Sequence, residues 1–339
     1  MDSAPNTQSD NSKAELESAL AESSRKISQI IDSVGRVVLG QENLRKRLIT
    51  ALVTDGHLLL EGVPGLAKTL AIKTFSDTME AQFSRIQFTP DLLPADLLGT
   101  EIFRPDKGDF IVRKGPVFSN FILADEINRA PAKVQSALLE IMQERQVTIA
   151  GETFKLPDPF LVLATQNPVE HEGTYPLPEA QVDRLIMKVK IDYPSGDDEF
   201  KMLETVTNRS DRSKPKAEIV ASLEDISKLK ETCSKIYVDD RIRRYIVTLV
   251  NATRNPKEFD LDLNSFIDLG ASPRASIALY ECARAEALLE GETFVRPEFV
   301  KRVAPDVLRH RLALSYEAEA QGLDSDQVVQ TILDGVPVP

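Results

Sequence analysis

The sequence predicts an α/β fold in which a five-stranded parallel sheet with helices on both faces is followed by an all-helical domain. Five apolar runs of strand length alternate with amphipathic helical patterns up to Ile191, and this alternation is typical of a parallel sheet. A glycine-containing loop, Gly62–Thr69, joins the first of these runs to a helix, as phosphate-binding loops do. Beyond Ile191 the patterns are helical, so we place a domain boundary near Pro194.

The predicted elements fall into a tail, a core and a helical domain. Residues 1–12 are rich in Ser, Asn and Asp and are expected to be disordered. The core, 13–194, begins with a helix whose apolar face can pack on a partner helix or on the chain's own core, and we favour the chain's own core. Residues 195–339 form the helical lid domain and a C-terminal tail. The expected core strands are Leu58–Glu61, Phe83–Phe88, Phe121–Ala124, Phe160–Thr165 and Leu185–Ile191, and the helices between them are 42–54, 68–81 and 132–145.

Turn residues also predict two hairpins inserted between the core elements. One spans 101–113 around Pro105–Gly108, and the other spans 147–156 around Ala150–Glu152. In the second domain we expect a loop at 255–270 and no strands. The predicted helices of that domain are 197–208, 223–237, 239–253, 273–289 and 296–314.

Composition restricts the classes of function. The formal net charge of −12 disfavours a broad nucleic-acid-binding surface, so nucleic acid is not an expected partner. No apolar run is long enough for a membrane span, and residues 1–10 lack a signal-peptide core. Cys233 and Cys282 have no metal-type spacing, so a reducing cytoplasm is the expected location. A disulfide between them is the alternative to apolar packing, and we favour apolar packing.

The loop carries the first candidate binding site. Its backbone N–H groups can hold phosphate oxygens, while Lys68 would reach the β- and γ-phosphates and Thr69 would bind Mg²⁺. Ala67 stands where the usual pattern has glycine, so we expect Ala67 to keep a negative φ. An ordinary strand–helix turn is the alternative for the loop taken alone. The expected phosphate-binding residues are Gly62, Val63, Pro64, Gly65, Leu66, Ala67, Lys68, Thr69 and Leu70.

Two acidic residues, Asp125 and Glu126, form the second candidate element. They follow Phe121–Ala124, a continuous apolar run typical of a strand buried on both faces. A carboxylate just past such a strand lies at the crevice of an open α/β sheet. We expect Asp125 to bind Mg²⁺ through water and Glu126 to polarise an attacking water. The alternative is that the pair caps the following helix.

Three further polar residues extend this site. The amide of Asn167, after the fourth strand, can hydrogen-bond the γ-phosphate or the water, although Asn before Pro is also common turn chemistry. Arg184 would lie at the domain's edge, within reach of a neighbour's nucleotide, unless it pairs with Asp183 in its own domain. Arg274 begins a helix of the second domain, where a cation opposes the helix dipole. An anionic ligand would explain that position, and a solvated arginine is the alternative.

With these elements in this order, the sequence resembles the AAA+ ATPases, and closely the MoxR family. The alanine before the lysine is itself characteristic of MoxR proteins, so Ala67 supports the resemblance. Leu185 departs from it, because phenylalanine is commoner after the Asp-Arg pair. The resemblance covers roughly Ser33 to Leu314 and is most specific in the phosphate loop, A-D-E-I-N-R-A-P at 124–131, A-T-Q-N-P at 164–168 and L-P-E-A-Q-V-D-R at 177–184.

The resemblance implies a role for each motif. The two predicted hairpins are similar to the helix-2 insert and the pre-sensor-1 hairpin, which face the central pore of a ring in this clade. The residue assignments are Walker A for Lys68 and Thr69, Walker B for Asp125 and Glu126, sensor 1 for Asn167, sensor 2 for Arg274, the arginine finger for Arg184, a second interface position for Arg129, and adenine packing for Val38, Leu39, Gly40 and Gln41.

The resemblance also implies a biochemical function. It predicts a cytoplasmic ATPase that uses ATP and Mg²⁺, with each active site shared between neighbours in a homo-oligomer, a hexameric ring. MoxR relatives act as chaperones that remodel client proteins or insert metal into them, often with a von Willebrand factor A domain partner. A metal-chelatase motor subunit and a nucleotide-gated scaffold with little turnover are the alternatives. Glu126 argues against the scaffold, and the net charge argues against a DNA motor.

Overall fold

The computed structural model describes residues 7–63, 65–167, 173–207 and 215–339. The chain divides into two compact units: Ser33–Ile219, here the core unit, and Met1–Asp32 with Val220–Pro339, here the helical unit. This division differs from the one expected from the sequence. The segment up to Asp32 groups with the helical unit, and the helix that follows Pro194 groups with the core unit.

The core unit is built on a five-stranded parallel sheet with the strand order β2-β5-β8-β1-β9. The sheet confirms the predicted fold class, and each predicted strand is present with its ends shifted by a few residues at most. Its strands are β1 (Leu58–Glu61), β2 (Phe83–Gln87), β5 (Phe121–Asp125), β8 (Leu161–Gln166) and β9 (Met187–Lys190). The helices of this unit are α2 (Glu42–Val53), α3 (Lys68–Asp77), α4 (Pro94–Leu98), η1 (Ile127–Arg129), α5 (Ala132–Glu144), α6 (Glu179–Val182) and α7 (Gly196–Thr207).

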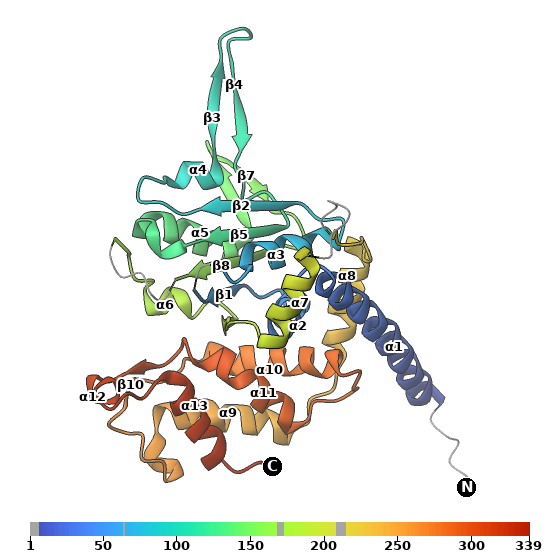
Figure 1. The fold of residues 1–339 in the computed structure, drawn as a ribbon, viewed down its shortest axis with the longest axis vertical. Coiled ribbons are helices and arrows are strands. Elements are labelled where there is room, and N and C mark those ends of the chain that lie inside the picture. The colour runs from blue at the N-terminus through green and yellow to red at the C-terminus, as the bar shows by residue number, and fades with distance from the viewer. Residues whose placement is uncertain (1–6, 64, 168–172, 208–214) are drawn as a thin grey trace. The chain divides into compact units, whose positions relative to one another are not determined.

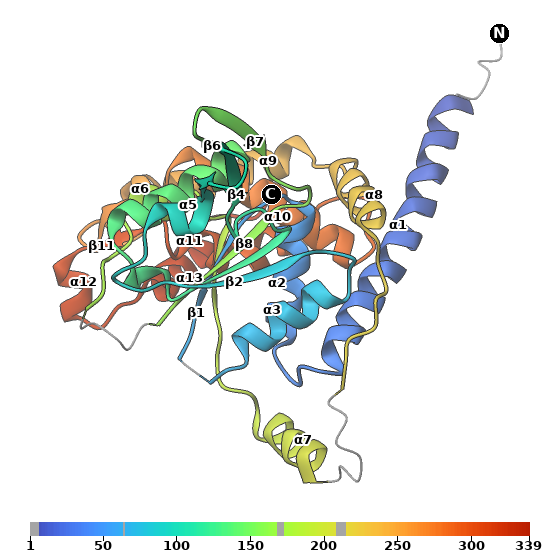
Figure 2. The same cartoon turned by 90° about the horizontal axis from the view of Figure 1, so that it is seen from above.

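Helices cover both faces of this sheet because the side chains of its strands are apolar on both sides. On one face Ile122 of β5 packs in a buried cluster with Val134 and Leu138 of α5. On the other face Phe121 meets Phe75 of α3 edge to face, with the ring centroids 5.8 Å apart. Figure 2 shows α3 and α5 on opposite sides of the sheet, an arrangement that leaves its strand ends available for a site.

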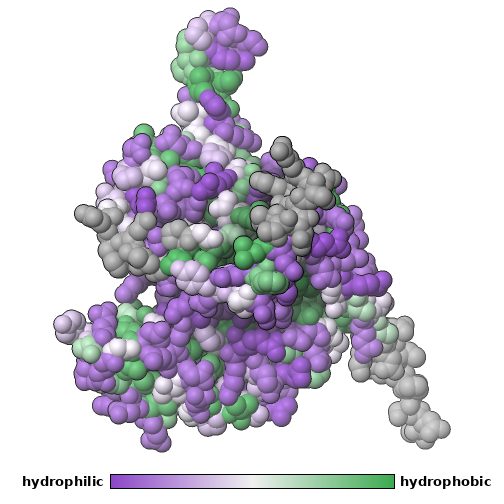
Figure 3. All heavy atoms as spheres, in the orientation of Figure 1, coloured by the Kyte–Doolittle hydropathy of each residue, from purple (hydrophilic) through white to green (hydrophobic). Residues whose placement is uncertain are grey.

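Two antiparallel hairpins extend from the core unit, as predicted. They are β3 (Gly99–Arg104) with β4 (Asp109–Lys114), and β6 (Gln146–Ile149) with β7 (Glu152–Lys155). The β3–β4 hairpin projects away from the sheet (Figure 1) and carries exposed apolar side chains (Figure 3).

Two aromatic rings are exposed on the β3–β4 hairpin, and glycines form its root. Phe103 and Phe110 are cross-strand neighbours with ring centroids 5.0 Å apart, and they are 49% and 62% exposed. At the root, a Cβ on Gly99 or Gly115 would overlap the facing backbone. The hairpin is therefore fixed at its base by close backbone contact, while its far end is open to solvent.

The helical unit contains more structure than the sequence predicted. Thr7–Gly35 form one helix, so 7–12 of the expected disordered tail are helical, and 1–6 lie outside the described residues. Leu314, expected within a helix, instead belongs to a strand that pairs with residues of the expected loop. The elements are α1 (Thr7–Gly35), α8 (Leu223–Ser234), α9 (Asp240–Arg254), η2 (Pro256–Phe259), β10 (Ile267–Leu269), α10 (Pro273–Leu289), α11 (Pro297–Leu308), β11 (Ala313–Leu314), α12 (Tyr316–Ala320) and α13 (Ser325–Gly335).

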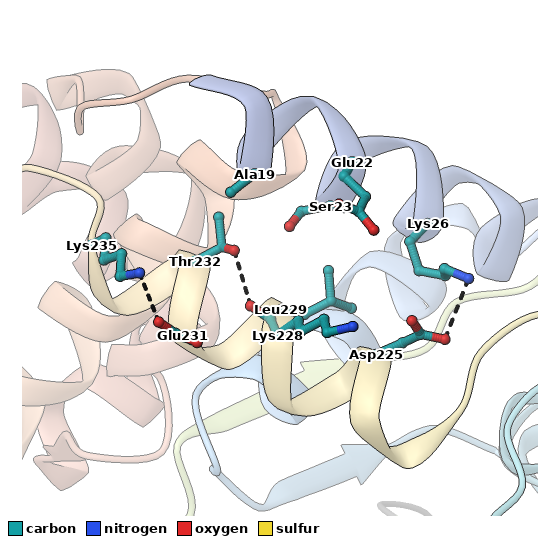
Figure 4. Close-up of a pocket in the computed structure, with 10 residues that line it drawn as sticks. All are labelled: Ala19, Glu22, Ser23, Lys26, Asp225, Lys228, Leu229, Glu231, Thr232 and Lys235. Atoms are coloured by element: carbon teal, nitrogen blue, oxygen red, sulfur yellow. Dashed lines mark hydrogen bonds and ion pairs between the residues drawn. The ribbon is translucent and has the colours of Figure 1, made fainter. Parts of the chain in front are cut away.

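Helix α1 packs on its own chain, which confirms the favoured interpretation of its apolar face. Leu20 and Ile27 are buried, and Lys26 Nζ lies 3.3 Å from Asp225 Oδ2 and donates to the carbonyl of Val220 at 3.0 Å. Figure 4 shows this pair at one end of a groove between α1 and α8. The contact explains why the N-terminal helix belongs with the helical unit.

Both cysteines are buried and neither forms a disulfide, as predicted. Burial raises the pKa of the Cys233 thiol to about 12, so this thiol stays protonated and unreactive at neutral pH. Among the described residues, no helix combines the length and apolar character needed to cross a membrane.

The buried side chain of His57, directly before β1, is a neutral ring that hydrogen-bonds the backbone of β8 and of α5. Its Nδ1 accepts from the Val162 N–H at 3.0 Å, and its Nε2 therefore donates to the Met142 carbonyl at 3.1 Å. Desolvation, aided by the charge of Arg145, lowers the pKa of His57 from 6.5 to about 3. Protonation would replace the acceptor that Val162 uses, so the folded chain resists it.

We expect this histidine to make the fold acid-sensitive. The unfolded chain binds a proton at His57 below pH 6.5 and the folded chain does not, so this stabilisation is present above pH 6.5 and is lost as the pH falls. Between pH 6.5 and 5 the loss is about 2 kcal/mol. Urea unfolding at both pH values, for the natural chain and for His57→Gln, measures it. Equal pH dependence in the two proteins would contradict this role.

Candidate nucleotide-binding site

The carboxyl ends of four sheet strands meet at one edge of the core unit, and the phosphate loop, Asp125, Glu126 and Asn167 lie at or directly after these ends. The parallel register sets Glu61 of β1 beside Gln166 of β8, and Gln87 of β2 beside Asp125 of β5. The loop after β1 stays attached at this edge, because the Gly62 N–H donates to the Gln166 carbonyl at 3.4 Å. Ligands of open α/β sheets bind at such an edge.

The phosphate loop needs glycine at two positions for different reasons. A Cβ on Gly62 would lie 2.8 Å from the Ile191 carbonyl oxygen, so only glycine allows this close approach. Gly65 has a φ of +91°, and a Cβ there would meet no atom within 4 Å, so the loop is open on that side. Leu66 is buried and Leu70 is exposed, whereas Pro64 lies outside the described residues.

The backbone conformation of Ala67 differs from the one expected from the sequence. Its φ is +55° and its ψ is 23°, so the predicted negative φ is wrong. Ala67 is the N-cap residue of α3, where the chain turns from the loop into the helix through a left-handed conformation. The left-handed conformation costs an L-residue with a Cβ roughly 1–2 kcal/mol. The chain therefore holds strain directly before Lys68, at the point where glycine would be free of it.

Lys68 and the two acidic residues influence one another. The Lys68 ammonium donates to the Gly62 carbonyl of its own loop. Desolvation lowers the pKa of Lys68, and the negative charges of Asp125 and Glu126 oppose this shift. The structure thus brings together three residues that the sequence predicted for one site, on the elements predicted to carry them.

Thr165 connects Asp125 to the backbone of Glu126, a role that sequence reasoning missed. Its hydroxyl donates to Asp125 Oδ1 at 2.7 Å and accepts from the Glu126 N–H at 2.8 Å. Glu126 has a φ of +57° and leads into η1, so its backbone turns sharply after β5. This arrangement holds the carboxylate of Asp125 and the backbone of Glu126 where the chain leaves the strand.

Strand β2 supplies two side chains that sequence reasoning also missed. Arg85 donates to Asp125 Oδ2 from Nε at 3.1 Å and from Nη2 at 2.6 Å. Gln87 donates to Glu126 Oε2 at 2.8 Å, and Arg129 Nε lies 3.1 Å from the same oxygen. The available signal was a polar pair at alternate positions of a strand that ends at the site edge.

The remaining candidate residues lie at separate places. Asn167 is buried directly after β8, at the same sheet edge. Arg184 is exposed between α6 and β9, and its Nη1 lies 3.5 Å from the Leu139 carbonyl of α5. Arg274 belongs to the helical unit, where it is exposed in the first turn of α10 and its N–H donates to Ser272 Oγ at 3.1 Å.

The segment expected to pack on adenine lies against the chain that follows β9. Val38 is buried, and Leu39 is half-buried. Gly40 has a φ of +69°, and a Cβ there would meet Asp198 Oδ2 at 3.2 Å. The side chain of Gln41 donates to the Asp192 carbonyl at 2.9 Å. These contacts also explain why α7 groups with the core unit.

The residues at this edge fit a nucleotide that carries its own Mg²⁺. A bound Mg²⁺ usually keeps several waters and takes only one or two protein oxygens in addition to substrate phosphates. The hydroxyl of Thr69 and the carboxylate of Asp125 are of this chemical type. In the described part of the chain no group of three or more His, Cys, Asp or Glu side chains is placed to hold a metal ion.

Comparisons with known proteins identify the family of this chain. Residues 57–187 match the model of the ATPase family associated with various cellular activities (AAA), and 262–332 match that of the AAA lid domain. "Chaperone MoxR1" of Mycobacterium tuberculosis is 48% identical, over 92% of this chain and 82% of that protein. "Protein MoxR" of Methylorubrum extorquens is 29% identical over 90% of this chain and 93% of its own length.

A solved structure has the same fold over nearly its whole length. A crystal structure from Cytophaga hutchinsonii, described as an ATPase, superimposes with a TM-score of 0.89 at 50% identity and covers 97% of this chain and 99% of that one. The match to the AAA models, the long alignments to MoxR proteins and the sheet edge described above point the same way. The chain belongs to the MoxR family of AAA ATPases.

Proposed function

We propose that this ATPase hydrolyses MgATP at the sheet edge, with water attacking the γ-phosphate in line. Lys68 binds the β- and γ-phosphates, and the loop N–H groups hold their oxygens. Glu126 accepts a proton from the water, and Asn167 orients the water or the γ-phosphate. Thr69 and Asp125 would hold Mg²⁺, which would supply charge stabilisation at the phosphate oxygens. Val38, Leu39 and Gly40 pack on the adenine.

One observation carries this proposal: Lys68, Asp125 and Glu126 lie close enough to act on one another. The negative charges of both carboxylates oppose the effect of desolvation on the pKa of Lys68, and Thr165 bonds the carboxylate of Asp125 and the backbone N–H of Glu126. A helix-capping role for the Asp-Glu pair would not need these contacts to Lys68. A cation and two carboxylates at one sheet edge instead match the charge pattern of phosphoryl transfer.

We further propose that the chain works as a homo-oligomeric ring, a hexamer, and acts on client proteins in the cytoplasm. Arg184 is exposed and belongs to the same unit as the phosphate loop, which suits an arginine offered to a neighbouring subunit. Arg274 then couples the nucleotide to the lid. A curated relative is named a chaperone, which supports a protein client. A von Willebrand factor A domain protein is the proposed co-partner.

Light scattering and client capture test the assembly and the client. At micromolar protein with ATP we expect a mass of several subunits for Glu126→Gln, and a monomer mass would contradict the ring. Tagged Glu126→Gln, held in ATP, should retain folded or unfolded client proteins that a Lys68→Ala control releases. Capture of the same proteins by both variants would contradict nucleotide-dependent client binding.

A further inference from the structure

Residues 173–184, here the arginine segment, end at Arg184 and are bound to the part of the chain that follows β5. Both polar backbone groups of Tyr175 take part. Its N–H donates to the Asn128 carbonyl of η1 at 2.7 Å, and its carbonyl accepts from Gln135 Nε2 of α5 at 3.1 Å. The early part of the arginine segment is therefore held on the same turn by which the chain leaves β5.

The side chain of Gln135 is fully buried and makes one of these two attachments. Its Nε2 also lies 3.3 Å from the Ile127 carbonyl and 3.1 Å from the Ala130 carbonyl, at the two ends of η1. Carbonyl oxygens only accept hydrogen bonds, so the amide must turn its NH₂ group toward them. One buried amide thus binds both η1 and the arginine segment.

A second attachment lies closer to Arg184. Helix α6 lies beside α5 (Figures 1 and 2), and Gln181 Nε2 of α6 donates to Ser136 Oγ of α5 at 3.0 Å. Leu177 and Val182 pack against the buried cluster that includes the apolar face of α5. Helix α6 has four residues and none of them is buried, so its contacts with α5 decide where Arg184 is presented.

Stability alone does not account for the amide of Gln135. Its Oε1 has no hydrogen-bond partner within the described ranges of the chain, and a buried acceptor without a partner costs free energy. Its two N–H hydrogens also cannot fully satisfy three carbonyl oxygens. What the amide achieves is geometric, because it sets the distance between η1 and the arginine segment.

We propose that Gln135 is a positioning residue for hydrolysis in the neighbouring subunit. It holds the arginine segment on η1 and so presents Arg184 to the neighbour's nucleotide. This inference rests on the proposed action of Arg184 in trans. It assigns to Gln135 an effect on turnover at the neighbour's site and none on nucleotide binding at its own site, since its bonds go to carbonyls of η1 and of the arginine segment.

The first test is Gln135→Met in the full-length chain, which nearly keeps the length of the side chain but cannot donate. We expect kcat to fall about tenfold or more, because a small misplacement of a catalytic group has effects of this order. Affinity for a fluorescent ATP analogue should stay within about twofold. Gln143→Met is the matched control, since it makes the same change at an exposed position of α5 and should leave kcat unchanged. A full kcat in Gln135→Met would overturn the inference.

Mixing variants shows whether Gln135 acts on its own site or on the neighbour's, with light scattering to confirm mixed assembly. Beside Glu126→Gln, a Gln135→Met subunit keeps its own base and receives a well-placed Arg184, so turnover should rise above that of either variant alone. Beside Arg184→Ala, the arginine comes only from Gln135→Met, so turnover should stay no higher than that of Gln135→Met alone. The opposite pattern would place the defect in the chain's own site and overturn the inference.

Ser136→Ala carries the same test if Gln135→Met is too unstable to assemble. It removes the acceptor of Gln181, and we expect kcat to fall about threefold and to be restored by Glu126→Gln but not by Arg184→Ala. An unchanged kcat in Ser136→Ala would then overturn the inference. If Glu126→Gln and Arg184→Ala restore each other but neither Gln135→Met nor Ser136→Ala is restored by Glu126→Gln, only the role of Gln135 fails. If Glu126→Gln and Arg184→Ala do not restore each other, the proposed shared site itself fails.

Discussion

Glu126→Gln is expected to reduce kcat for ATP hydrolysis by about 100-fold or more, since general base catalysis contributes roughly 10²–10⁴. The amide has nearly the shape of the carboxylate but cannot take the proton of the attacking water. Its oxygen can still accept from Gln87 and Arg129, so the contacts at Oε2 survive the change. Phosphate release measures the loss, and binding of a fluorescent ATP analogue shows that the site is intact.

Glu140→Gln provides the matched control for this change. Glu140 is exposed on α5, away from the contacts of the site edge, so the same substitution should leave turnover as it was. An unchanged rate in Glu126→Gln would remove this residue from the mechanism and favour a scaffold that binds ATP with little turnover.

Arg184→Ala is expected to lower kcat by about 10³-fold in the assembled state, because arginine supplied in trans contributes roughly 10³–10⁵ to phosphoryl transfer. Nucleotide binding by the isolated chain should change little, since Arg184 is proposed to act on a neighbour's nucleotide. Phosphate release at increasing protein concentration measures the effect. The natural chain should gain activity as it assembles, and the variant should not.

Mixing two inactive variants distinguishes action in trans from action within one chain. In a mixed ring, an Arg184→Ala subunit keeps its own Glu126 and can receive Arg184 from a Glu126→Gln neighbour. We expect such mixtures to regain turnover that neither variant shows alone. Mixtures that stay inactive, although light scattering shows mixed assembly, would place Arg184 in its own chain's site.

The central sheet and its motifs were predictable because the information is local. Phe121–Ala124 is continuous and apolar, which indicates a strand buried on both faces, and the residues that follow it must leave at the carboxyl edge. The phosphate loop can likewise be recognised from its own residues alone. Ala67 shows the limit of such reasoning, because its φ is set by the turn into α3 and not by the residue type.

The rest depends on pairing between segments that are distant in the sequence. Arg85 and Gln87 join the site only because β2 lies beside β5, which brings Gln87 level with Asp125. Strands β10 and β11 have three and two residues, too few for any periodicity to indicate a strand. The expected C-terminal tail forms the helix α13, and its Val329 and Ile332 are fully buried. No pattern in the preceding chain predicts this packing.

The close backbone packing at Gly99 and Gly115 lets the β3–β4 hairpin move only as one rigid arm. Each of its strands has six residues, so the arm is about 20 Å long at the usual rise of about 3.3 Å per residue. Because backbone meets backbone at Gly99 and Gly115, the base cannot shift without turning the whole arm. A rotation of about 10° at the base would carry the far end of the arm through about 3.5 Å, roughly the length of one residue of an extended chain.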